Sequence, residues 1–114
     1  MLQERIAEIA EYIRSQLEES GVRVGKLILF GSAARNSMNE DSDLDFAVVS
    51  ISFGNVGSES RALLKKRALV GAIHKYQIPI DLFTLTPEEY EQRTQAISHY
   101  VADGKELYLS LIHI

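Results

Sequence analysis

The chain has 114 residues, 46% of them hydrophobic and 25% charged, which is typical of one globular domain. We therefore expect residues 1–114 to form a single domain. The formal net charge of −4 argues against broad, charge-driven binding to nucleic acid, which needs a basic face. The chain contains no cysteine, so disulfides and thiolate chemistry are excluded. Its start is unlike a signal peptide, and no apolar run reaches the roughly 18–20 residues that span a membrane, so we expect a cytoplasmic protein.

The first part of the chain predicts a helix followed by a buried strand. Apolar residues recur at three- and four-residue spacing over residues 2–19, as in an amphipathic helix, and Gly21 is placed to end it. Residues 22–30 then turn extended and finish with four consecutive apolar residues. Such a run suits a strand that is covered on both faces.

Gly31 interrupts that strand and begins a polar region. Ser32 is a good cap for a short helix through Arg35. Residues 36–42 are rich in turn-forming residues and predict a loop. Residues 44–50 return to an extended pattern and predict the next strand.

The middle of the chain predicts a loop, a helix and a third strand. Residues 51–60 contain two glycines, an asparagine and serines, and we interpret them as a flexible surface loop that could cover the site. Helical spacing over residues 61–76 includes a basic patch, residues 65–67, which we interpret as a solvated helix face. Residues 77–85 predict a strand, and Pro79 near its start indicates an edge position.

The last part of the chain carries clear helix signals. Thr86, Pro87 and Glu89 have the spacing of an N-cap, a first helical residue and a capping box. One or two helices should follow toward Gly104, then a short strand over residues 105–109, and an apolar tail that docks on the body or on a partner. This order of elements predicts an α/β (α+β) fold, a mixed sheet of three to four strands with helices packed on it.

Three aspartates are the candidates for chemistry. Asp43 and Asp45 are two residues apart at the start of a strand, so both side chains leave the same face, about 6.5–7 Å apart. Asp81 lies in the otherwise apolar third strand, where a lone charge is costly. If that strand pairs beside the strand of Asp45, the three carboxylates share one face. Oxygen ligands favour Mg²⁺ or Mn²⁺, and three carboxylates around two such ions suit phosphoryl or nucleotidyl transfer.

A phosphate site is predicted just before the aspartates. Gly31 lets the backbone approach a ligand closely, and Ser32 adds a hydroxyl at the start of the expected helix. Arg35, one turn on, is placed to reach a phosphate oxygen.

The pattern Gly31-Ser32, ten residues, then Asp43-Leu-Asp45 resembles the signature of the DNA polymerase β-type nucleotidyltransferase superfamily. The local sequence Phe-Gly-Ser-Ala-Ala-Arg, followed by Asp-Ser-Asp-Leu-Asp, is similar to the minimal nucleotidyltransferases, the MNT proteins. These are small stand-alone domains often paired with HEPN-type toxins. The resemblance implies a polymerase β-like nucleotidyltransferase fold over the whole chain.

The resemblance also implies roles for single residues. Gly31 and Ser32 would hold the β- and γ-phosphates of a nucleotide, and Arg35 matches a frequent arginine whose role is less settled. Asp43, Asp45 and Asp81 would bind two Mg²⁺ ions, with Mn²⁺ as an alternative. Asp81 would also take the proton of the attacking hydroxyl.

The resulting hypothesis is a Mg²⁺-dependent nucleotidyltransferase that moves AMP from ATP to a hydroxyl, in the subgroup a tyrosine of the cognate HEPN toxin, and so acts as an antitoxin. An alternative is an antitoxin or subunit that acts by protein binding alone. Another is transfer to a small molecule, although such enzymes usually need a longer chain. The oligomeric state stays open, with a homo-oligomer or an assembly with the toxin both compatible with the sequence.

Overall fold

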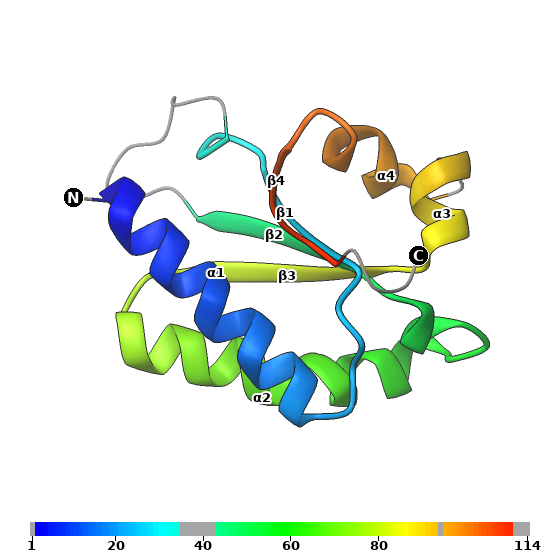
Figure 1. Ribbon diagram of the computed structural model, residues 1–114, viewed down its shortest axis with the longest axis horizontal. Coiled ribbons are helices and arrows are strands. Elements are labelled where there is room, and N and C mark those ends of the chain that lie inside the picture. Colours follow the sequence, from blue (N-terminus) through cyan, green and yellow to red (C-terminus); the bar gives the residue numbers. More distant parts are fainter. Residues whose placement is uncertain (1, 35–42, 94, 111–114) are drawn as a thin grey trace.

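The protein is described here by a computed structural model that covers residues 2–34, 43–93 and 95–110 (Figure 1). Within these residues the chain forms a four-stranded sheet with helices on both faces, so the predicted mixed α/β architecture is confirmed. In chain order the elements are α1 (Leu2–Glu19), β1 (Lys26–Phe30), β2 (Leu44–Val49), the 3₁₀ helix η1 (Ile51–Phe53), α2 (Ser58–Tyr76), β3 (Ile80–Leu85), α3 (Pro87–Gln92), α4 (Ala96–Val101) and β4 (Lys105–Leu109).

The strand order is β3-β2-β1-β4. β1 runs antiparallel to both β2 and β4, whereas β2 and β3 are parallel and connected through α2. β3 is therefore an edge strand, as Pro79 predicts.

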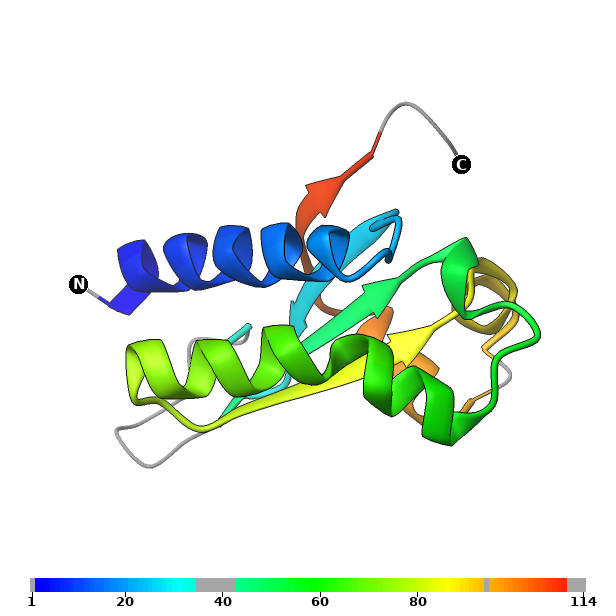
Figure 2. The same cartoon turned by 90° about the horizontal axis from the view of Figure 1, so that it is seen from below.

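The longer helices, α1 and α2, lie side by side on one face of the sheet (Figures 1 and 2). The residues buried between them and the sheet include Ile9 and Ile13 of α1, Ala72 of α2 and Phe46 of β2. The shorter helices, α3 and α4, cover part of the other face (Figure 1). Because side chains alternate along β2, every second residue from Leu44 faces α1 and α2, and the residues between face the opposite side.

The strand predicted over residues 22–30 is shorter in the structure, where β1 begins at Lys26. The preceding backbone has other partners. The Val22 N–H closes the end of α1 on the carbonyl of Leu17, and the Arg23 N–H donates to the hydroxyl of Ser52. Backbone groups engaged in this way cannot join a ladder.

The short helix predicted from Ser32 to Arg35 is not formed in its described part. Residues 31–34 are a turn, and Arg35 lies outside the described residues. A capping serine stabilises a helix but does not start one, because forming the first helical turn is unfavourable. The cap signal at Ser32 therefore could not establish that a helix follows it. The expected loop of residues 36–42 also lies outside the described residues.

The prediction of a loop over residues 51–60 is confirmed for residues 54–57 only, because helical structure occupies the rest of this range. Ser50 caps η1 by accepting from the Ser52 N–H at 2.9 Å, Phe53 is fully buried, and α2 begins at Ser58. The segment also follows the far end of β2 from Asp43, about 20 Å away over six strand residues. It therefore does not cover the aspartates.

The last elements match their sequence signals closely. Thr86 and Glu89 form the capping box, with the Glu89 N–H donating to the Thr86 hydroxyl at 3.0 Å and the Thr86 N–H donating to Glu89 at 2.8 Å. β4 spans the predicted residues 105–109. Ser110 is buried and its N–H donates to the Gly25 carbonyl, so the tail starts against the body, and residues 111–114 lie outside the description.

Candidate functional site

The three aspartates meet at one end of the sheet. Asp43 directly precedes β2 and Asp45 is its second residue. In the parallel register of β2 and β3, Asp45 is the Cα partner of Asp81. The expectation that Asp81 joins the face of Asp45 is thereby confirmed at the level of strand pairing. Asp45 is partly buried, and the other two are exposed.

The position of Asp45 makes its carboxylate harder to ionise. Burial raises the pKa of Asp45 above its ordinary value, and the negative charges of Asp81 and Asp43 raise it further. Like charges held side by side on a sheet are unfavourable unless a cation neutralises them. In the absence of a cation, the close position of these carboxylates is therefore electrostatically unfavourable.

Gly31 is packed directly against this cluster. It has a φ of +76°, a left-handed conformation that side chains disfavour. A Cβ atom built there would lie 2.4 Å from Oδ2 of Asp45. The last residue of β1, Phe30, is the Cα partner of Asp45, which explains the proximity. Glycine is thus required both for the turn and for the position of the Asp45 carboxylate.

The predicted phosphate residues and the predicted metal residues are therefore neighbours. Ser32 lies in the turn that follows Gly31 and is partly exposed. As the side chains lie, the described residues contain no group of three or more histidine, cysteine or acidic side chains close enough to hold a metal ion. Arg35, the third predicted nucleotide-binding residue, lies outside the described residues.

Lys65 lies beside the cluster, although its sequence position indicated a solvated patch. Its side chain is partly buried against β3, and its Nζ donates to the carbonyl of Leu82 at 2.6 Å. Burial lowers the pKa of Lys65, while the charge of Asp81 acts in the opposite direction. Its neighbours Lys66 and Arg67 are exposed, as the patch interpretation predicted for all three.

A signal in the sequence could have separated Lys65 from its neighbours. It is three and seven residues before Ala68 and Ala72, which are fully buried on the sheet side of α2. Residues at these spacings share a helix face. A lysine on the apolar stripe of a helix is expected to reach along apolar surface toward a polar partner.

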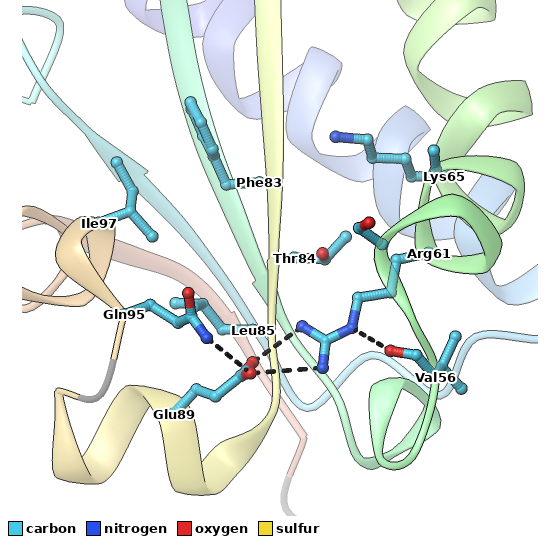
Figure 3. A pocket seen from close by; sticks show the side chains of 11 residues that line it. Val56, Arg61, Lys65, Phe83, Thr84, Leu85, Glu89, Gln95 and Ile97 are labelled. Atoms are coloured by element: carbon cyan, nitrogen blue, oxygen red, sulfur yellow. Dashed lines mark hydrogen bonds and ion pairs between the residues drawn. The ribbon is translucent and has the colours of Figure 1, made fainter.

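A pocket of about 450 Å³ lies next to Lys65, between α2, β3 and the region of α3 and α4 (Figure 3). Phe83, Thr84 and Leu85 of β3 contribute to one wall, and Arg61 and Lys65 of α2 to another (Figure 3). Its lining mixes apolar and polar side chains.

An ion pair holds one end of this pocket. Arg61 donates to Glu89 at 2.9 Å, and both side chains are 17% exposed. Arg61 also donates to the carbonyls of Val56 and Phe53. Burial opposes ionisation of Glu89, but the bonds from Arg61 and Thr86 outweigh it and lower the pKa of Glu89. Glu89, which completes the capping box of α3, therefore also links α3 to α2. The capping pattern in the sequence did not indicate this second contact.

A sequence profile of a known protein family matches most of this chain. The sequence profile described as "Nucleotidyltransferase domain" matches residues 6–110. This range includes all six candidate residues. No curated protein matches the chain.

Solved structures show the same fold. A Sulfolobus solfataricus protein assigned as a nucleotidyltransferase superposes with a TM-score of 0.71 at 19% identity, over 98% of this chain and 87% of that one. A toxin-antitoxin structure with AMP-PNP gives a TM-score of 0.63 at 18% identity, covering 90% and 74% of the two chains. The toxin-antitoxin MntA-HpeT, in a mutant with two aspartates changed to glutamate, gives 0.62 at 18% identity with the same coverage.

The part of the chain that the structure describes includes no helix with the length and hydropathy to cross a membrane.

Proposed function

Because the chain belongs to the nucleotidyltransferase domain family, we propose that it transfers a nucleoside monophosphate, AMP from ATP, to a hydroxyl group of a partner protein. The observation that carries the proposal is the pairing of Asp45 with Asp81 next to Gly31. It brings the predicted phosphate turn and the predicted carboxylates together from three separate parts of the chain.

In this proposal the turn at Gly31 and Ser32 binds the terminal phosphates of the nucleotide, with Arg35 as a further contact. Asp43, Asp45 and Asp81 hold divalent metal, Mg²⁺ or Mn²⁺. The donor set fits such ions, because it is made of carboxylate oxygens only and its mutual repulsion is relieved by a cation. When bound, the metal neutralises charge on the phosphates and on the reacting oxygens.

The residues of the chain then have separate tasks. Asp81 accepts the proton of the attacking hydroxyl. Gly31 leaves room for the Asp45 carboxylate beside the phosphates. The hydroxyl oxygen forms a bond to the α-phosphorus, the bond from this phosphorus to the bridging oxygen breaks, and pyrophosphate leaves.

The proposed acceptor is a tyrosine of a cognate HEPN-type toxin, which AMP transfer would silence. Support comes from the toxin-antitoxin structures that share the fold, one of them with AMP-PNP.

The test uses α-labelled ATP, MgCl₂ and the protein encoded by the adjacent reading frame. We expect label on that protein with the wild-type chain, and loss of at least 100-fold of the rate with Asp43→Asn plus Asp45→Asn. Absence of transfer by the wild type, or equal transfer by the double variant, contradicts the proposal.

Binding without catalysis is a second candidate function, and the outer side of α2 favours it. Leu63 and Val70 are 72% and 56% exposed there, which is unusual for large apolar side chains on a solvated helix. In that case neutralisation of the toxin would survive the double aspartate variant.

A further inference from the structure

The strand order indicates from which side an acceptor approaches. The turn at Gly31 follows β1, whereas Asp81 is on β3, with β2 between them. In an in-line transfer the attacking oxygen and the leaving group lie on opposite sides of the phosphorus. If the leaving pyrophosphate is held at the turn after β1, the acceptor hydroxyl comes from the β3 side.

The outer edge of β3 offers backbone groups to a partner. The Leu44 and Ser50 N–H groups donate to the carbonyls of Pro79 and Leu85, so the odd-numbered residues of β3 face β2. In a parallel sheet the N–H and C=O groups of successive residues point to alternate sides of the strand. The backbone groups of Leu82 and Thr84 therefore point away from β2. The outward carbonyl of Leu82 accepts a hydrogen bond from Lys65. Thr84, two residues further along β3, lines the 450 Å³ pocket.

The pocket extends along this edge away from Asp81. Lys65, whose Nζ donates to the carbonyl of Leu82 beside Asp81, lies near the Phe83 end of the pocket, and the Arg61–Glu89 pair closes the end near Leu85 (Figure 3). Phe83 and Thr84 are partly exposed and point to opposite sides of β3, so the pocket offers an apolar side chain at Phe83 and backbone groups for hydrogen bonds at Thr84. This combination suits an extended polypeptide, which satisfies main-chain groups and places alternate side chains in a groove.

We propose that this pocket receives an extended segment of the acceptor protein, which adds to the open edge of β3 at Thr84 and brings its hydroxyl to Asp81. The inference rests on the proposed function and specifies how that function selects its acceptor. Asp81 and Thr84 are three residues apart, about 10 Å along a strand. The modified residue of the acceptor therefore lies about three residues from the one that pairs with Thr84.

The experiment compares two serine-to-tryptophan substitutions near the start of α2. Ser58 lines the pocket and Ser60 does not line it, and both are exposed. With the adjacent-frame protein as acceptor, we expect Ser58→Trp to lower kcat/KM for the acceptor at least tenfold and Ser60→Trp to change it less than twofold. The affinity for AMP-PNP should be the same in both. Equal transfer by the two variants overturns the proposal.

A second variant tests the backbone pairing. Thr84→Pro removes an outward-facing N–H and leaves the hydrogen bonds between β3 and β2 in place, a change that edge strands tolerate, and we expect acceptor transfer to fall at least tenfold with the AMP-PNP affinity retained. Unchanged transfer by Thr84→Pro overturns the strand addition.

A separate binding arm distinguishes this inference from the proposed function. If the wild type transfers no label, binding of the adjacent-frame protein is measured by calorimetry with Asp43→Asn plus Asp45→Asn as the background. Weaker binding after Ser58→Trp, but not after Ser60→Trp, supports the pocket as a docking site although the proposed reaction has failed. Equal binding by both overturns it.

Discussion

Substitution of Gly31 by alanine tests whether the turn positions the Asp45 carboxylate. Two effects are expected. The φ of +76° costs a non-glycine residue about 1–2 kcal/mol of folding free energy. In addition, the new Cβ would lie 2.4 Å from Asp45 Oδ2, and ordinary contact begins at 3.4 Å, so the carboxylate must retreat by about 1 Å.

Gly21→Ala is the matched control. Gly21 also has a positive φ, +92°, but a Cβ there would meet nothing within 4 Å. Both variants should therefore lose a similar stability, a fall in Tm of roughly 4–8 °C by thermal denaturation. Gly31→Ala alone should lose about 100-fold in nucleotidyl transfer, the scale of a displacement of about 1 Å in a reacting centre.

The assay measures label transfer from ATP at a temperature where both variants remain folded by circular dichroism. Transfer by Gly31→Ala at the rate of Gly21→Ala would refute the argument, because it would mean that the clash is relieved without cost to the site.

Three further predictions concern charge. At neutral pH without metal, Asp45→Asn should raise the free energy of unfolding by up to about 1 kcal/mol, measured as a higher Tm. The gain should shrink in acid melts, because a carboxyl whose folded pKa is raised stabilises the protein as the pH falls through that pKa. Addition of MgCl₂ should raise the Tm of the wild type but not of Asp43→Asn plus Asp45→Asn, as seen by scanning fluorimetry; an equal shift in both would place the ion elsewhere. Glu89→Gln should cost about 2 kcal/mol in urea denaturation at neutral pH, and less as the pH falls through the lowered pKa of Glu89, whereas the exposed Glu88→Gln should cost less than about 0.5 kcal/mol.

The carboxylate arrangement could be predicted because it depends on short-range rules. Alternation along a strand places Asp43 and Asp45 on one face, and a lone aspartate in an apolar strand, Asp81, needs a reason to be there. The parallel pairing then required only that the helix between the strands return the chain to the neighbouring position. The edge position indicated by Pro79 and the helix start indicated by Thr86 and Glu89 could be predicted for the same reason, because each depends on a few adjacent residues.

The features that sequence reasoning missed depend on contacts between distant residues. Glu89 meets Arg61 across 28 residues, and nothing near either one in the sequence announces the other. Lys65 was grouped with Lys66 and Arg67 by charge, although its place on the helix face separates it from them. The glycines and serines of residues 51–60 indicated a loop, whereas the burial of Phe53 depends on core residues that are distant in the sequence.

The position of Asp81 on an edge strand has a consequence for how such a protein can change over time. The groups proposed to hold the donor nucleotide come from the turn after β1 and the start of β2, in the middle of the sheet. Those that line the open side of β3 come from α2, β3 and the short helices that follow. Substitutions that adapt the protein to a new acceptor can therefore accumulate along one border of the molecule while the nucleotide site keeps its residues.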